Sequence, residues 1–182
     1  SFFESLSKDF FSQRSLLGIN DQEVILKYLI NFSTYYINSG RNEYVKTHFH
    51  LYKVGLDIGC LIKTQLISKQ IFQNIIISSC FLKKFDWALT FIEDYQIYLN
   101  EEIRDVSVNF NLSYLYFHQG HFLKTINILN QLKPIRTLDK ILTKTLLIKS
   151  YFEVFVDDDS YEDILLSSID AYEKFIRRDT QI

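Results

Sequence analysis

The sequence has little of the chemistry that makes turns: one proline and five glycines in 182 residues. An all-β sandwich or barrel needs turn residues at intervals of roughly 8 to 12 positions. This scarcity excludes such folds and favours long helices. The only proline, Pro134, lies between two helical patterns, where a proline would end a helix.

Cysteine and methionine are also scarce. The two cysteines, Cys60 and Cys80, are flanked by apolar residues, as buried free thiols usually are. Two cysteines form no disulfide framework in a chain of this length, which indicates a reducing compartment. We therefore expect a cytoplasmic protein. The sequence contains no methionine, even at its first position, which indicates a fragment of a longer protein.

Targeting signals and long apolar runs are missing. The opening residues Ser1 to Glu4 lack the basic and then apolar pattern of a secretory signal. The most apolar stretch, residues 71–82, is interrupted by polar residues and is too short to span a bilayer. We expect no membrane partner.

The common catalytic motifs are missing as well. The sequence has no glycine-rich phosphate loop, no Gly-x-Ser-x-Gly elbow, no Cys-x-x-Cys pair and no His-Glu-x-x-His helix. We therefore predict that the protein is not an enzyme and has no cofactor.

Hydrophobic residues, by contrast, make up 47% of the chain and aromatic residues 16%. This content is ample for a buried core and unlike that of disordered chains. The net charge of −2 provides no overall basic field for nucleic acid. The charge is unevenly divided, because residues 1–84 carry ten basic and six acidic residues, whereas residues 85–182 carry ten and sixteen.

Short breaks divide the sequence into helical segments. We predict helix hairpins over residues 21–56, 65–100, 104–134 and 137–178, with a flanking or capping helix in residues 1–18. Asn20 and Glu23 have the spacing of a capping box, and Ser160 and Asp163 repeat it. Gly120 suits a left-handed helix end.

Internal similarity gives these hairpins a period. Residues 85–92 align with residues 122–129 at an offset of 37, and Leu112 and Tyr116 align with Leu147 and Tyr151 at an offset of 35. A pair of helices in each period indicates a solenoid, because one hairpin cannot bury its apolar face alone.

Residues 111–126 resemble a tetratricopeptide repeat. The family's leucine, small, aromatic and turn positions correspond here to Leu112, Ser113, Tyr116, Gly120, Phe122 and Thr125. Residues 85–88 are similar to the same opening of a second helix. The likeness is partial over residues 69–100 and loose over 24–56 and 141–176. Pro134 comes about three residues earlier than in the family, and Ile76 occupies a small-residue position.

The resemblance implies an all-α, right-handed α-solenoid of about four stacked antiparallel helix hairpins in a single domain, residues 1–182. It also implies that the first helix of each hairpin lines a concave groove. Such an aromatic groove could bind an amphipathic helix, an extended peptide or a neighbouring domain. The implied groove residues are Gln73, Ile77, Cys80, Phe81, Phe110, Tyr114, Phe117, His118, Lys149, Phe152 and Glu153.

Some family members clamp a terminal carboxylate with Lys and Asn at these groove positions. Gln73, Ile77, Phe110 and Tyr114 stand there in this chain, which argues against that mode. Phe110, Tyr114 and Phe117 share one face of their helix. We predict that Leu112, Leu115 and Tyr116 face other sides and pack in the core, and that Trp87 is also buried.

Other polar clusters favour ordinary roles. His118 and His121 are separated by Gly120 and have no further ligand nearby in sequence, so we expect no metal there. His48 and His50 point to opposite sides of a helix. The acidic run Asp157 to Asp159, with Glu162 and Asp163, lacks the spacing of a calcium loop and predicts a solvated helix start. Arg177 and Arg178 suit a helix C-terminus.

The leading hypothesis is a non-catalytic scaffold that binds a protein or peptide. One alternative is an RNA-binding helical-repeat array of the pentatricopeptide kind, which the negative charge after residue 85 disfavours. Another is an all-α enzyme whose site is not visible in the sequence. The identity of the partner and the oligomeric state are left open.

Overall fold

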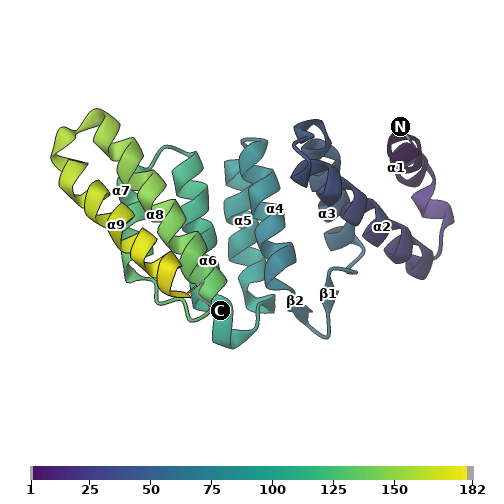
Figure 1. Cartoon of the computed structure of the whole chain (residues 1–182). Helices are drawn as coiled ribbons and strands as arrows, with labels where there is room; N and C mark the ends of the chain where they lie inside the picture. Colours follow the sequence, from purple (N-terminus) through teal and green to yellow (C-terminus); the bar gives the residue numbers. More distant parts are fainter. Residues whose placement is uncertain (1, 180–182) are drawn as a thin grey trace. The chain divides into compact units, whose positions relative to one another are not determined.

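The computed structural model describes residues 2–179, which are almost wholly helical (Figure 1). The all-α class is confirmed. The α-helices are α1 (Phe2–Gln13), α2 (Ile19–Asn38), α3 (Val45–Asp57), α4 (Lys69–Phe81), α5 (Phe85–Tyr95), α6 (Glu101–His118), α7 (Phe122–Gln131), α8 (Thr137–Asp157) and α9 (Glu162–Asp179). Short 3₁₀ turns are η1 (Arg14–Leu16), η2 (Asn42–Tyr44), η3 (Gln96–Tyr98) and η4 (Asp159–Tyr161).

A small β-hairpin was not expected from the sequence. Strands β1 (Ile62–Lys63) and β2 (Leu66–Ile67) pair antiparallel. Strand β2 lies where a helix was predicted to begin at residue 65. Thr64 and Gln65 form the turn with φ values of 49° and 63°. Tight hairpins usually place Asn or Gly at such positions, so Thr-Gln gave no turn signal.

The predicted capping box at the start of α2 is wrong. Gly18 occupies the N-cap position in an extended conformation, without a side-chain cap. Asn20 therefore lies inside the first turn. Glu23 forms ion pairs with Lys27 and Lys63 instead of returning to the backbone.

Helices α2, α4 and α6 end in the same backbone motif. Gly40, Lys83 and Gly120 adopt φ values of 84°, 55° and 80°. At the end of α6, the N–H of Gly120 donates to the carbonyl of Phe117 and the N–H of His121 donates to that of Tyr116, at 3.0 and 2.9 Å. This is the Schellman arrangement, and it confirms the left-handed turn predicted at Gly120.

The spacing of these turns agrees with the internal period in the sequence. Lys83 and Gly120 are 37 residues apart, the offset found between residues 85–92 and 122–129. Five residues after each turn, Val45, Ala88 and Thr125 are all buried. The same position after each turn is therefore part of the buried core.

The contacts group the residues into two compact units. Unit 1 contains residues up to Ala88 with Ile97–Asn100, and unit 2 contains Leu89–Gln96 with the residues from Glu101 onward. Helix α5 contributes to both units. The sequence predicts a single domain over residues 1–182.

Unit 1 has a core contributed by α1, α2, η2 and α3. Its buried members include Phe3, Phe10, Leu26, Leu29 and Leu51. Trp87, predicted to be buried, is only partly buried, and its ring lies edge-on to Phe49 at 4.8 Å.

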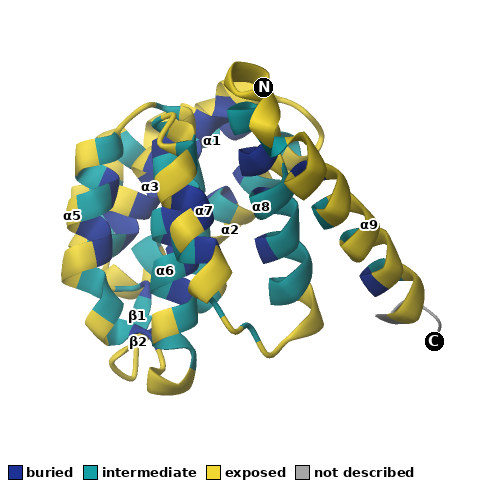
Figure 2. Ribbon diagram, turned by 90° about the vertical axis from the view of Figure 1, so that its left-hand side faces the viewer, coloured by how far each residue is buried: buried dark blue, intermediate teal, exposed yellow. Residues whose placement is uncertain are grey.

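Unit 2 has two neighbouring clusters. Phe110, Leu129 and Leu146 join α6, α7 and α8, whereas Ile126, Tyr151 and Leu165 join α7, α8 and α9. Most of α9 is exposed (Figure 2). None of the described helices has both the length and the apolar character needed to cross a membrane.

Candidate binding surfaces

The aromatic stripe of α6, formed by Phe110, Tyr114 and Phe117, is more deeply buried in unit 2 than the sequence predicted. Phe110 is 8% exposed and packs with Leu129 and Leu146 in the core of unit 2. This corrects its assignment to an accessible groove, because α7 and α8 cover its ring. Tyr114 and Phe117 are partly buried against the same cluster.

His118 is the exposed end of this stripe. Its ring lies 4.5 Å from the ring of Tyr114 and 5.5 Å from that of Phe117, measured between centroids. Phe117 also lies edge-on to Phe122 at 5.4 Å. The last turn of α6 therefore presents an aromatic ledge, defined here as Tyr114, Phe117 and His118.

Helix α8 brings a cation to this ledge. Partial burial of the ring lowers the pKa of His118, and the nearby ammonium of Lys149 lowers it further. Phe152, 52% exposed, and the partly buried Glu153 follow Lys149 within about one helical turn. Unit 2 thus brings the predicted residues of α6 close to Lys149 on α8.

The predicted residues of α4 belong to unit 1. Gln73 and Ile77 are partly buried, whereas Phe81 is 52% exposed at the end of the helix. Cys80 is buried, and burial raises the pKa of its thiol to about 12. Of these residues, Phe81 alone offers a largely exposed apolar side chain.

An exposed apolar stripe lies on α2 and was not identified as a binding site from the sequence. Val24, Tyr28, Phe32 and Tyr35 are 52%, 62%, 47% and 67% exposed. Their spacing places them on one face of the helix. We call these four residues the α2 stripe.

The opposite side of α2 is also apolar and faces the core of unit 1. Leu26, Leu29 and Ser33 are fully buried. Packing against one core accounts for only one apolar face of a helix. The second apolar face of α2 was therefore the feature of the sequence that could have indicated a binding surface.

The acidic cluster predicted from the sequence lies at the surface of the described part of the chain. Among residues 2–179, no group of three or more His, Cys, Asp or Glu side chains is placed to hold a metal ion. Asp157, Asp158 and Asp159 are exposed. The Asp158 carboxylate accepts a hydrogen bond from the N–H of Ser160 at 3.0 Å, which lowers its pKa. Asp158 thus caps the 3₁₀ turn η4 that precedes α9.

An open cavity of about 700 Å³ lies beside this loop. His121, Lys124, Asp157 and Asp158 line it and are exposed, and the partly buried Tyr161 also contributes to the lining. The Lys124 ammonium lies 3.6 Å from the centroid of the Tyr116 ring. The lining thus carries charges of both signs at the surface.

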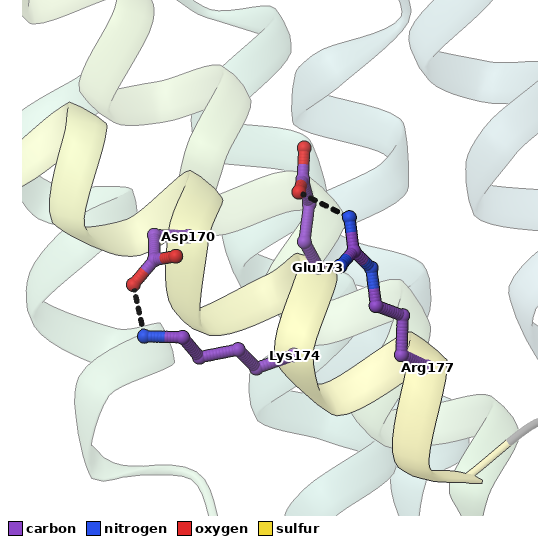
Figure 3. A network of polar contacts seen from close by, with 4 residues as sticks. All are labelled: Asp170, Glu173, Lys174 and Arg177. Carbon is purple, nitrogen blue, oxygen red and sulfur yellow. Dashed lines mark hydrogen bonds and ion pairs between the residues drawn. The ribbon is translucent and has the colours of Figure 1, made fainter.

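The outer face of α9 carries exposed ion pairs (Figure 3). Lys174 contacts Asp170 at 2.6 Å, and Arg177 contacts Glu173 at 3.4 Å, each pair one helical turn apart. Exposed pairs of this kind contribute little to stability. This face of α9 therefore resembles an ordinary solvated helix surface.

Comparisons with protein-family models, with characterised proteins and with solved structures found no match to the chain.

Proposed function

We propose that the protein is a non-catalytic interaction scaffold built from tetratricopeptide-like helix hairpins arranged as a solenoid. In this proposal, a helix or peptide of a partner protein packs along the first helices of the hairpins. The partner covers aromatic side chains that the isolated chain leaves in water.

The observation that carries this proposal is the exposure of the α2 stripe. Phe32 and Tyr35 lie eight and five residues before the Schellman turn of α2. The equivalent residues of α4 are Ile75 and Ser78, which are 0% and 4% exposed. In α4 this face is covered within the protein, whereas α2 presents large aromatic side chains at the same positions.

Exposed aromatic stripes of this kind are typical of interaction sites. Tyrosine and phenylalanine bury a large area with few rotatable bonds, so they are enriched where proteins bind each other. A contiguous apolar surface also carries an aggregation risk unless a partner covers it. The ledge of unit 2, with Lys149 and Phe152, provides a second surface of mixed aromatic and basic character.

Capture of partners by variant proteins tests the proposal. We would compare the native chain with Tyr28→Ser/Tyr35→Ser on α2 and with Ile164→Ser/Leu166→Ser on α9. All four side chains are exposed, with Ile164 at 42% and Leu166 at 56%, so both variants should keep the native melting temperature.

The expected result is a partner, identified by mass spectrometry, that the native chain and the α9 variant retain and the α2 variant loses. Isothermal titration with that purified partner should show the same order. If the α2 variant binds every partner as tightly as the native chain, the α2 stripe is not the binding surface.

A further inference from the structure

A cavity in unit 1 combines an apolar floor with a basic rim. Its volume is about 460 Å³, within the range of about 300 to 1,000 Å³ typical of ligand sites. Residues of α3 and of the turn after α4 line it, together with Phe11 at the end of α1. No local sequence pattern indicates this site, because its residues are distant along the chain.

The floor is aromatic and well anchored. Phe49 is 5% exposed, and its ring lies edge-on to that of Trp87 at 4.8 Å. Phe11 lies edge-on to His50 at 4.4 Å. Leu82, just after α4, completes the apolar part of the lining. A hydrophobic side chain would therefore meet a preformed surface.

The rim is formed by Lys46, Lys53 and Lys84, all exposed. Among the described residues, no carboxylate forms an ion pair with any of them. In the same unit, by contrast, Lys27 and Lys63 share Glu23.

The pKa of His50 is sensitive to the charges around this cavity. Burial lowers its pKa, and Lys53 and Arg14 lower it further. Asp57 acts in the opposite direction but is the smallest contribution. The local charge therefore favours an anionic ligand.

The spacing of the lysines selects among anionic ligands. Lys46 and Lys53 are seven residues apart on α3, or about 10 Å along the helix axis. Lys84 comes from a different element. Carboxylates spaced along a peptide can pair with lysines set this far apart, whereas a single phosphate would have to draw the three side chains together.

We propose that this cavity binds an acidic peptide segment of a partner protein. One hydrophobic side chain of the peptide would rest on Phe49 and Leu82, while flanking carboxylates pair with Lys46, Lys53 and Lys84. The site does not depend on the α2 stripe or on unit 2, so it can be tested separately from the proposed scaffold function.

Fluorescence anisotropy with a defined probe tests this site. The probe is the peptide Glu-Asp-Phe-Glu-Asp-Leu-Glu carrying an uncharged dye, measured against the full chain. The pocket variant is Lys46→Glu/Lys53→Glu. The control is Lys8→Glu/Lys133→Glu, which changes the net charge equally at exposed residues outside the cavity. Circular dichroism establishes that both variants are folded.

We expect the native chain and the control to bind the probe with similar affinity, and the pocket variant to bind about tenfold more weakly. Replacing both apolar residues of the probe by serine should also weaken binding. In two-dimensional NMR, the probe should shift the signals of Phe11, Phe49 and His50, which gives a second measurement should the pocket variant fail to fold.

Three results would overturn the inference. The first is no binding of the probe by the native chain. The second is equal weakening in the control, which would indicate diffuse charge attraction. The third is tighter binding of inorganic phosphate or of a uridine oligonucleotide than of the peptide, since either would identify a different class of ligand.

Discussion

Helix α4 ends with a lysine at the position where the equivalent helices α2 and α6 have glycine. Gly40, Lys83 and Gly120 occupy the same position of the Schellman turn, with positive φ. A side chain is costly in this conformation, because its Cβ approaches the backbone. The chain therefore contains a natural comparison at a single position of one motif.

We predict opposite stability changes at two of these turns. Gly120→Ala should destabilise the protein by about 1 kcal/mol, and Lys83→Gly should stabilise it by about 0.5 to 1 kcal/mol. A Cβ at Gly120 would have no neighbour within 4 Å, so the cost comes from the backbone alone. Urea denaturation measures both changes, and changes of the same sign would contradict the shared motif.

His48 is a buried base in unit 1. It is 4% exposed, and its Nδ1 lies 2.7 Å from the Ser33 hydroxyl. Burial lowers the pKa of His48 from 6.5 to about 4. The folded protein therefore holds this ring neutral at pH values where the unfolded chain protonates it.

This pKa difference predicts a loss of stability in acid. The contribution of His48 is complete above pH 6.5 and falls as the pH decreases toward 4, by roughly 2 kcal/mol at pH 5. Urea denaturation at pH 7 and pH 5 measures the loss, which His48→Gln should reduce. The pKa values of His50 and His118 are also lowered, so part of the pH dependence should remain. An unchanged pH dependence in His48→Gln would contradict this assignment.

At the scale of helices, α6 and α8 separate core from surface. Phe110 on α6 is 8% exposed and Phe152 on α8 is 52% exposed. Phe110→Ala should cost about 3 to 5 kcal/mol, because it opens a cavity among Leu129 and Leu146. Phe152→Ala should cost less than about 1 kcal/mol.

Thermal and urea unfolding of the two variants measure this contrast. Leu115→Ala is the matched control, because Leu115 is 0% exposed on the same helix as Phe110 and its loss should cost about 2 to 5 kcal/mol. Similar costs for Phe110 and Phe152 would show that the exposed face of α8 is covered in solution.

The helices could be predicted because their apolar residues recur at helical spacing and their ends carry recognisable signals. The breaks near Gly40, Lys83 and Gly120 are examples. The β-hairpin at residues 62–67 could not, because its turn residues, Thr64 and Gln65, are not the usual ones for positive φ. Local sequence preference indicates where helices end, but it does not reveal a turn formed by residues that rarely adopt positive φ.

The candidate site was less predictable than the fold. The helical pattern correctly placed Phe110, Tyr114 and Phe117 on one face, yet that pattern is the same for a core and for a groove. Only the packing of α7 and α8 shows that Phe110 is covered. The basic cavity joins residues from Phe11 to Lys84, and no local pattern indicates that contact.

At the scale of the whole molecule, charge separates the two main hypotheses for function. The net charge is −2, and residues 85–182 hold sixteen acidic against ten basic residues. RNA binding along a helical array needs basic residues that neutralise many phosphates. The unit 1 cavity is lined by three lysines, Lys46, Lys53 and Lys84.

We therefore predict weak RNA binding by the full chain. In a filter-binding assay with a uridine-rich oligonucleotide, the dissociation constant at 50 mM salt should exceed about 10⁻⁵ M, because few counterions can be released. Lys46→Glu/Lys53→Glu tests whether residual binding comes from the unit 1 cavity, and Lys8→Glu/Lys133→Glu is the matched control. Submicromolar binding that weakens steeply between 50 and 200 mM salt would instead favour the RNA-binding alternative, since such a slope requires contacts to several phosphates.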